Sequence, residues 1–379
     1  MSQIQKIKMV DLKSQYLEIK EEIDERIQAV IDTSSFINGP QVKEFETSLG
    51  NFLNAEVIGC ANGTDALQIA LMALELKPGD EVVVPAYTYI ATAEVIALLN
   101  LVPVLCDVNP FTFNICPDSF KKAIGPHTKA VIAVHLFGQC SEMKRVMEIA
   151  EENSLFVVED NAQAIGASIT KGKYASSKAG TIGHIGTTSF FPSKNLGCYG
   201  DGGALITKDA KLAERIRMIA NHGQKKRYYH DIIGVNSRLD SIQAAILNVK
   251  LIKLNEYSSA RRGSANIYDD LLEGIDQIST PHRVDYSTHV FHQYTLIVED
   301  GLRDELVAYL KVNGVPTGIY YPLPIQEQKG FKDICVERVS LTQSSRLSNS
   351  VMSLPIHTHL RIEAQRFIAY KIQDFFNEK

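Results

Sequence analysis

Residues 81–108 read EVVVPAYTYIATAEVIALLNLVPVLCDV, and this stretch decides the fold class. The apolar run EVVVP is followed by a helical pattern, ATAEVIALL (91–99), and then by a second apolar run, PVLCDV (103–108). Runs that are apolar on both faces and alternate with helices are typical of parallel strands covered on both sides. The stretch therefore predicts one strand–helix–strand unit of an α/β sheet.

The same alternation continues on both sides of this unit. EVIGC (56–60) precedes the helical pattern TDALQIALMALEL, and the apolar runs AVIAVHL (130–136) and LFVVED (155–160) follow. We therefore predict that residues 36–255 form a large domain around a mainly parallel sheet.

The two ends of the chain have a different character. Apolar positions at helical spacing over 12–32 indicate an amphipathic helix, so residues 1–35 are predicted to form an N-terminal helical segment. A long helical pattern over 239–256 leads into a smaller C-terminal domain, residues 256–379, in which strands and helices look antiparallel and mixed.

Composition narrows the class of protein. The chain of 379 residues is 45% hydrophobic and has a net charge of −5, so no basic excess exists to bind nucleic acid or an anionic membrane. Its 6 cysteines lack metal-ligand spacing, and no histidine grouping suggests a metal site. We expect a cytoplasmic protein with reduced thiols, because the charged N-terminus is unlike a signal peptide and no run approaches the roughly 18 apolar residues of a membrane span.

The segment CANGTDALQIAL (60–71) predicts an anion site. A glycine turns the chain after a strand, and Gly63, Thr64 and Asp65 open a helix whose free N–H groups and dipole attract anions. The alternative is ordinary capping of that helix by Thr64 or Asp65.

The segment VVEDNAQAIGA (157–167) places a carboxylate at the end of a central strand, where open α/β sheets bind their ligands. Asp160 could accept a hydrogen bond from a protonated ring nitrogen, or it could simply cap the next helix. Glu159 alternates to the opposite face, so it receives no role in this site.

The segment SFFPSKNLGCYGDGGALIT (189–207) surrounds Lys194 with apolar residues and glycines. A nucleophilic lysine must be desolvated, and the preceding Phe-Phe-Pro supplies dry surroundings. The glycines let the backbone pass close to a bound ring, and Ser189 could donate to a phosphate. The alternative is a glycine-rich hairpin with an exposed lysine. An anion site, a strand-end carboxylate and a buried lysine together match the needs of pyridoxal 5′-phosphate.

The sequence resembles the DegT/DnrJ/EryC1/StrS family of pyridoxal-phosphate-dependent nucleotide-sugar aminotransferases almost from end to end. The resemblance rests on these motifs: FINGPQVKEFE, CANGTDALQIAL, VPAYTYIATAE, HLFGQC, VVEDNAQAIGA, SFFPSKNLGCYGDGGA, NHGQ, GVNSRLDSIQAAIL and YYPLPIQEQ. It implies the aspartate-aminotransferase-like fold type I, in which a large domain with a mainly parallel, seven-stranded mixed sheet is followed by a smaller C-terminal α+β domain.

The resemblance also implies roles for single residues. Lys194 would form a covalent imine with the cofactor and move the substrate proton, and Asp160 would pair with the pyridinium nitrogen. The remaining cofactor contacts would be Gln163 at the phenolic oxygen, Tyr89 stacked on the ring, and Gly63, Thr64, Asp65 and Ser189 at the phosphate. Tyr89 could otherwise be a core tyrosine at a strand end. Asn236 would reach the phosphate of the neighbouring subunit, which implies a homodimer with shared active sites. The alternative for Asn236 is a capping turn.

The implied reaction is a transamination in which L-glutamate leaves as 2-oxoglutarate and the amine passes to a nucleotide-linked keto-sugar. The motifs around Lys194 and Arg238 look most similar to those of aminotransferases acting on UDP-2-acetamido-2-deoxy-3-oxo-glucuronate, for O-antigen and other lipopolysaccharide synthesis. Arg238 would meet the sugar carboxylate across the dimer, with Tyr320 and Tyr321 as further substrate contacts. Many relatives have a histidine at the position of Tyr320 and another at the position of Gln326.

Other functions remain open at this point. Within the same fold, the alternative is a dTDP-3-oxo-6-deoxyhexose aminotransferase. Outside it, a nicotinamide-binding enzyme would need a GxGxxG after the first strand, which the chain lacks. A dehydratase of the family would carry a histidine at the position of Lys194, and a non-catalytic regulator on this fold would be expected to lack that lysine.

Overall fold

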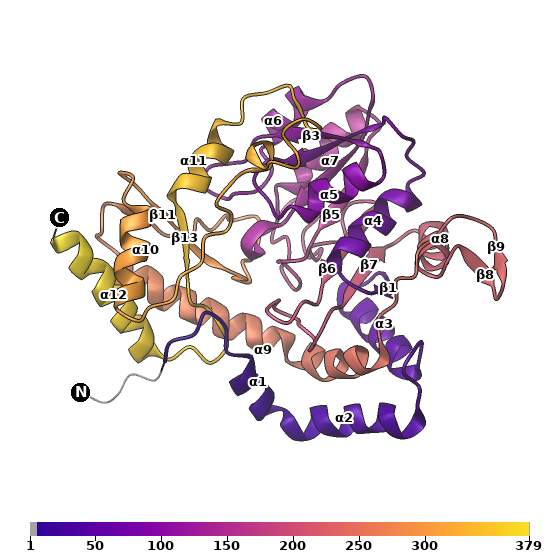
Figure 1. The fold of residues 1–379 in the computed structure, drawn as a ribbon, viewed down its shortest axis with the longest axis horizontal. Coiled ribbons are helices and arrows are strands. Elements are labelled where there is room, and N and C mark those ends of the chain that lie inside the picture. Colours follow the sequence, from indigo (N-terminus) through magenta and orange to yellow (C-terminus); the bar gives the residue numbers. More distant parts are fainter. Residues whose placement is uncertain (1–5, 379) are drawn as a thin grey trace.

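The computed structural model describes residues 6–378, and its centre is a sheet whose strands follow the order β1-β7-β6-β5-β4-β2-β3-β12 (Figure 1). The strands are β1 (Glu56–Cys60), β2 (Glu81–Pro85), β3 (Val102–Cys106), β4 (Thr128–Val134), β5 (Phe156–Asp160), β6 (Ile185–Ser189), β7 (Gly203–Thr207) and β12 (Val336–Glu337). Only β7 runs antiparallel to its neighbours. The predicted mixed sheet is therefore present in strands β1 to β7, and the short β12 adds an eighth strand beside β3.

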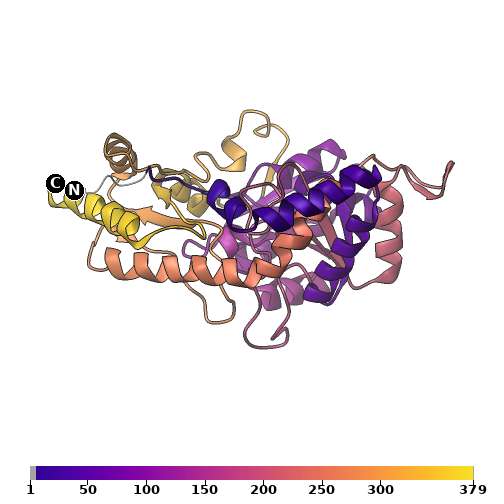
Figure 2. The same ribbon diagram turned by 90° about the horizontal axis from the view of Figure 1, so that it is seen from below.

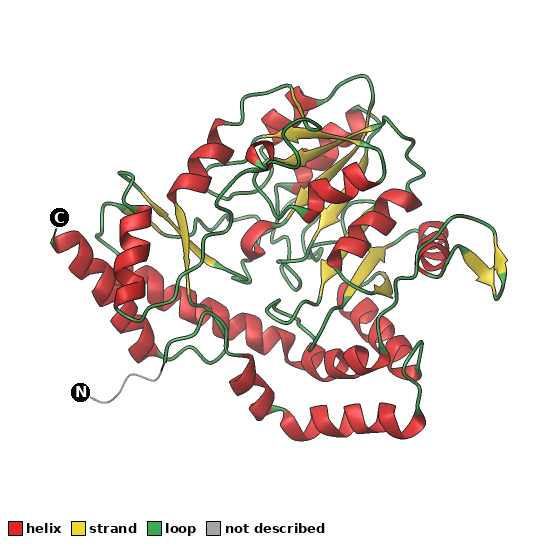
Figure 3. Cartoon of the chain, viewed as in Figure 1, coloured by secondary structure: helices red, strands yellow, loops and turns green. Residues whose placement is uncertain are grey.

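The sheet is buried on both faces because helices cover both sides of it (Figure 3). Every residue of β2 is buried, as its continuous apolar run predicted, and so is every residue of β7, which was not predicted as a strand. The covering helices of the large domain are α3 (Pro40–Leu53), α4 (Gly63–Ala73), α5 (Ala91–Leu98), α6 (Pro117–Ala123), α7 (Met143–Glu152) and α8 (Ala210–Ala220), with the 3₁₀ turn η1 (Leu136–Gly138).

The N-terminal helical pattern forms two helices rather than one. α1 (Leu12–Glu18) ends at Ile19, whose backbone leaves the helical region, and α2 (Lys20–Thr33) continues beyond it. α2 and α3 pack along α9 (Ser241–Leu272), a single helix of 32 residues (Figures 1 and 2). The domain boundary near residue 255 falls inside α9 and stays a prediction. Residues 1–5 and 379, which belong to the predicted end segments, lie outside the described residues.

The C-terminal part builds a second core around an antiparallel sheet. Its elements are β10 (Ile278–Ser279), β11 (Tyr294–Val298), α10 (Arg303–Val312), η2 (Ile325–Glu327), α11 (Thr342–Ser350), β13 (Val351–Leu354) and α12 (Ile362–Asn377). The core residues Tyr268, Leu296 and Ile368 share one apolar cluster here, and Ile7 from the N-terminus joins it. β12 and the buried Ile325 return to the large domain, so the chain crosses between the two cores more than once.

A hairpin of β8 (Gln224–Lys226) and β9 (Tyr229–His230) projects from the body of the molecule (Figures 1 and 2). Tyr228 and Tyr229 on it are 75% and 61% exposed. Within residues 6–378, no helix has the length and apolar character needed to cross a membrane.

Candidate active site

The predicted site residues gather at the carboxyl ends of neighbouring strands. Asp160 is the last residue of β5, Ser189 is the last residue of β6, and these two strands pair in parallel. Lys194 follows β6, and Tyr89 follows β2. Because parallel strands end at one edge of the sheet, residues from distant parts of the sequence converge there.

Lys194 lies in a tight loop that the surrounding backbone holds in place. Its N–H donates to Phe191 O at 2.8 Å, and Cys198 N donates to Phe190 O at 2.8 Å. A Cβ on Gly197 would stand 2.4 Å from Pro192 O, so only glycine fits this turn. Desolvation lowers the pKa of Lys194 to about 8, and the nearby Asp160 carboxylate partly opposes that shift.

The two phenylalanines predicted to shield Lys194 differ in burial. Phe190 is fully buried and packs edge-on against Phe45, at 5.2 Å between ring centroids, but Phe191 is 52% exposed. The expectation that both phenylalanines shield the lysine is therefore corrected. Only the first of the pair points into the core, because consecutive side chains leave the strand end in opposite directions.

Asp160 is buried and faces the same space as Lys194. Its Oδ1 accepts from Ala162 N at 3.1 Å, and its Oδ2 accepts from the Thr92 hydroxyl at 3.3 Å. Burial raises the pKa of Asp160, and the hydrogen bond from Ala162 and the charge of Lys194 act in the opposite direction. A carboxylate in this position gains most from a cationic N–H partner, which the nitrogen of a pyridinium ring offers. Thr92 carried no signal in the sequence beyond its place in a helical pattern.

Gln163, Tyr89 and Tyr321 form one wall of the site. Gln163 Oε1 accepts from Phe137 N at 2.7 Å, and Gln163 Nε2 donates to the Tyr321 hydroxyl at 3.1 Å. The Tyr321 and Tyr89 rings lie 5.9 Å apart between centroids, and Tyr89 is 56% exposed. Tyr89 is thus not a core tyrosine, and its open ring face fits a stacking role. Tyr320 lies beside this wall, half-buried.

The start of α4 fits the predicted phosphate site. Asn62 caps the helix, because its Oδ1 accepts from Asp65 N at 2.8 Å, so neither Thr64 nor Asp65 is the cap. Among the described residues the N–H groups of Gly63 and Thr64 have no acceptor, and they are free for an anion. A Cβ on Gly63 would stand 2.7 Å from Ser189 Cβ, so glycine brings the helix start and the end of β6 together.

Asp65 takes part in this site differently from a phosphate ligand. Its Oδ2 accepts from the Ser237 hydroxyl at 2.6 Å, and Ser237 Oγ accepts from Ala61 N at 3.1 Å. These bonds hold the segment that contains Asn236 and Arg238 beside the start of α4. Asn236 is exposed, Arg238 is half-buried, and within residues 6–378 Arg238 has no ion pair. Their roles, and that of Asp65 at the phosphate, stay predictions.

Glu159 lies on the opposite face of β5 and is fully buried. It accepts hydrogen bonds from His135 Nε2 and from three backbone N–H groups of the loop before β6. Sequence reasoning gave it no role in the ring site, and its contacts instead fix the loops on which the site stands.

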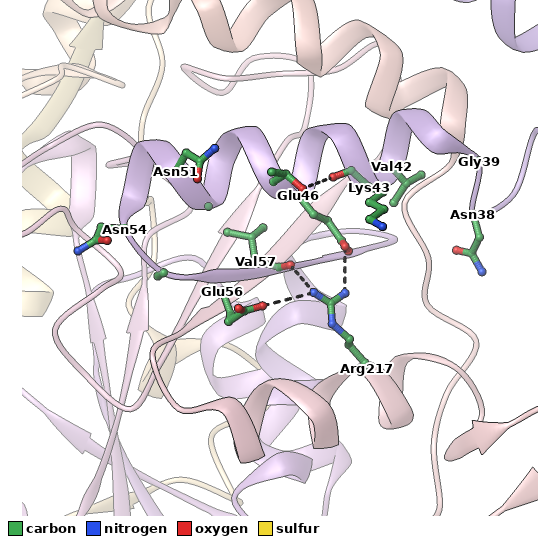
Figure 4. Close-up of a pocket in the computed structure, with 13 residues that line it drawn as sticks. Asn38, Gly39, Val42, Lys43, Glu46, Asn51, Asn54, Glu56, Val57 and Arg217 are labelled. Atoms are coloured by element: carbon green, nitrogen blue, oxygen red, sulfur yellow. Dashed lines mark hydrogen bonds and ion pairs between the residues drawn. The ribbon is translucent and has the colours of Figure 1, made fainter.

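A groove with a volume of about 710 Å³ lies outside this site, between α3, β1 and α8 (Figure 4). Arg217 crosses it and is paired with Glu46 at 2.9 Å and with Val57 O at 3.1 Å. None of the predicted site residues lines this groove. Over the described part of the chain, no cluster of three or more His, Cys, Asp or Glu could hold a metal ion.

The fold and this set of side chains define a class: a pyridoxal-phosphate-dependent transaminase with an α/β large domain. Within that class the chain belongs to the DegT/DnrJ/EryC1/StrS aminotransferase family, whose sequence profile matches residues 17–373. The predicted family, enzyme class and cofactor are confirmed.

Two relatives cover nearly the whole chain. A UDP-2-acetamido-2-deoxy-3-oxo-D-glucuronate aminotransferase of Pseudomonas aeruginosa is 45% identical over 355 residues, which are 93% of this chain and 96% of the relative. A pleiotropic regulatory protein of Geobacillus stearothermophilus is 44% identical over 373 residues, 98% of each chain. The crystal structure of ntda from Bacillus subtilis, with bound pyridoxamine phosphate, is 30% identical with a TM-score of 0.89, covering 100% of this chain and 86% of that one.

Proposed function

We propose that this nucleotide-sugar aminotransferase moves the amino group of L-glutamate to the 3-keto carbon of UDP-2-acetamido-2-deoxy-3-oxo-glucuronate. Its place would be in the cytoplasm, in the synthesis of an O-antigen or similar surface polysaccharide. The observation that carries the choice of sugar is Arg238, a half-buried guanidinium without an ion pair among the described residues. The name of the P. aeruginosa relative supports the same choice.

The chain's own residues divide the work of binding. Gly63, Thr64 and Ser189 would hold the phosphate of pyridoxal phosphate, Tyr89 would cover its ring, and Gln163 would meet the phenolic oxygen. When bound, the cofactor supplies an electron sink for the carbon that loses a proton.

Two ionisable groups control the proton. Asp160 keeps a ring nitrogen charged, because a buried carboxylate is most stable beside a cation. The Lys194 amine takes and returns the substrate proton, and its pKa of about 8 leaves roughly a tenth of it neutral at pH 7 even before a ligand excludes water. At an unperturbed lysine pKa of about 10.4, less than about a thousandth would be neutral at that pH.

We propose a homodimer in which Asn236 and Arg238 serve the neighbour's site. Asn236 is exposed on the surface of one chain. The β8–β9 hairpin begins twelve residues before Asn236 and projects from the body of the molecule. It carries two exposed tyrosines and the cations Lys225, Lys226 and Arg227. The exposed Tyr228 and Tyr229 and the neighbouring Arg227 are residue types in which protein interfaces are enriched, which supports a contact of this hairpin with a second subunit.

The sugar assignment is tested with Arg238→Ala and two 3-oxo substrates, the glucuronate and a neutral 6-deoxyhexose. Loss of a buried charged partner typically costs about 2 to 5 kcal/mol. Because 2 kcal/mol corresponds to a factor of about thirty, kcat/KM for the uronate should fall about thirtyfold or more. The neutral sugar should hardly be affected. Arg145→Ala, which removes an exposed cation far from the site, is the control.

Three results would count against the proposal. Equal losses for both sugars would assign Arg238 to the nucleotide phosphates or to the dimer interface. A wild-type preference for the neutral sugar would favour the dTDP-3-oxo-6-deoxyhexose alternative. A purified protein that binds the cofactor but aminates no nucleotide sugar would favour a regulatory role, which the name of the G. stearothermophilus relative raises.

A further inference from the structure

Tyr87 is a fully buried tyrosine directly behind the candidate site, and no role described so far uses it. It follows β2, two residues before Tyr89. Its hydroxyl donates to Tyr320 O and accepts from Tyr321 N, the latter at 3.0 Å. The phenol oxygen of Tyr87 is therefore hydrogen-bonded to the C=O of Tyr320 and to the N–H of Tyr321.

This contact ties two distant parts of the chain together. Tyr320 and Tyr321 follow Gly318, which bridges to Ser353 in the C-terminal sheet, and both rings pack against the apolar cluster that contains Tyr87. Tyr87 belongs to the large domain, and the sequence separation across the bond is more than 230 residues. The packing of the Tyr87 ring against Phe113, at 6.3 Å between centroids, leaves the hydroxyl in a fixed place.

The segment that Tyr87 holds carries a side chain of the cofactor site. The Tyr321 hydroxyl accepts from Gln163 Nε2 at 3.1 Å, while Gln163 Oε1 is occupied by Phe137 N. The amide of Gln163 is therefore oriented at both ends, and one N–H of its Nε2 is left for a ligand. Burial raises the pKa of Tyr321, so its hydroxyl keeps a proton.

We infer that Tyr87 is a positioning residue for the cofactor site. It fixes Tyr321, and Tyr321 in turn sets the direction in which Gln163 donates to the phenolic oxygen of the bound cofactor. This inference rests on the proposed contact of Gln163 with that oxygen, but not on the identity of the sugar.

The test compares Tyr87→Phe with Tyr268→Phe as a matched control. Tyr268 is also fully buried and donates one hydrogen bond to a backbone carbonyl, that of Pro355, but it lies in the C-terminal core. Three quantities are measured for each variant: the thermal midpoint of the apoprotein, the dissociation constant of pyridoxal phosphate, and the pH midpoint of the visible absorption of the bound cofactor. None of the three needs a sugar substrate.

Both variants should lose some thermal stability, because Tyr87→Phe removes two hydrogen bonds and Tyr268→Phe removes one. Only Tyr87→Phe should weaken cofactor binding, by about fivefold or more, which is the change that one hydrogen bond of about 1 kcal/mol produces. It should also raise the pH midpoint by at least about half a unit, because the anionic phenolic oxygen loses an oriented donor. Tyr321→Phe should give the same shift, and the double variant should add little to it.

A Tyr87→Phe protein that matches Tyr268→Phe in cofactor affinity and pH midpoint would overturn the inference and leave Tyr87 a packing residue. A wild-type pH midpoint in Tyr321→Phe would also overturn it, because the hydrogen bond between Tyr321 and Gln163 would then have no effect on the cofactor. A protein that shows these shifts but aminates no nucleotide sugar would defeat the proposed function and leave this inference standing.

Discussion

Replacing Glu159 by glutamine is expected to destabilise the apoprotein by about 4 kcal/mol, although the change removes no carbon and fills no cavity. The Glu159 carboxylate accepts four hydrogen bonds in a fully buried place. Oε1 accepts from Ile182 N and Gly183 N, both at 2.6 Å. Oε2 accepts from His135 Nε2 at 2.8 Å and from Gly180 N at 3.0 Å.

The magnitude follows from the donors that glutamine leaves without an acceptor. A glutamine keeps one oxygen and presents an NH₂ group to the other two donors. The His135 ring cannot solve the conflict by moving its proton, because its Nδ1 already accepts from Ser141 N at 3.1 Å. Two buried donors therefore lose their partner in either orientation. At about 1 to 3 kcal/mol for each unsatisfied donor, the loss is about 2 to 6 kcal/mol.

The pH dependence gives a second signature. Burial opposes ionisation of Glu159, but the hydrogen bonds from His135 and from the backbone N–H groups of Gly183 and Ile182 hold its pKa below the ordinary value of 4.5. The ionised carboxylate thus stabilises the protein at all pH values above 4.5, and that contribution is lost as the pH falls through the lower folded pKa. The difference in unfolding free energy between wild type and Glu159→Gln should be full at pH 7 and should shrink in acid.

The assay is urea unfolding followed by circular dichroism, combined with hydrogen exchange of residues 180–183, whose amides should exchange faster in the variant. Glu148→Gln, at an exposed pair on α7, should change the unfolding free energy by less than about 0.5 kcal/mol. The reasoning would be refuted if the unfolding free energy of Glu159→Gln lay within about 1 kcal/mol of the wild-type value and hydrogen exchange in the loop were unchanged. The four donors would then not depend on the carboxylate for their acceptor.

Two further predictions concern the site itself. Borohydride should attach pyridoxal phosphate covalently to Lys194 and to no other lysine, and a label on another lysine would contradict the assignment. In the apoprotein, the rate at which Lys194 is acylated should rise with pH with a midpoint near pH 8, because burial lowers its pKa to about 8. Peptide mass spectrometry measures both labels. Mixing inactive Lys194→Ala subunits with Arg238→Ala subunits, which are slow on the uronate, should restore one site of normal kcat/KM in each mixed dimer. No recovery after subunit exchange confirmed by native mass spectrometry would mean that Arg238 serves its own chain's site or is structural.

The sheet and the centre of the site could be predicted from sequence because both leave local patterns. Buried parallel strands read as continuous apolar runs, and β2, β3 and β5 begin and end within two residues of the predicted runs. Asp160 and Lys194 stand at or just beyond strand ends, which meet at one edge of a parallel sheet. The cap of α4 was missed in favour of Thr64 or Asp65, although a signal existed, since Asn62 directly precedes the helix and asparagine is a favoured cap.

The supporting contacts could not be predicted, because they join residues with no common pattern. Ser237 bonds to Asp65 over 172 residues, and Tyr87 bonds to Tyr321 over 234. A serine or a tyrosine at such positions looks like any other, and only the folded chain shows its partner. The short β12 was missed for a related reason, because two residues are too few to show a period.

The long helix α9 sets a condition on how this chain is made. α2 and α3 pack against α9, and Gly39 N bonds to Ser241 Oγ, which is synthesised 202 residues later. At about 5 to 20 residues per second, a ribosome needs about 10 to 40 seconds to cover that distance. During that time the apolar faces of the first helices lack the cover of α9, although Phe45 and Leu49 of α3 gain Val57 and Phe190 as partners earlier. The nascent chain therefore depends on fast completion, or on a holding chaperone, long before any site exists to bind a ligand.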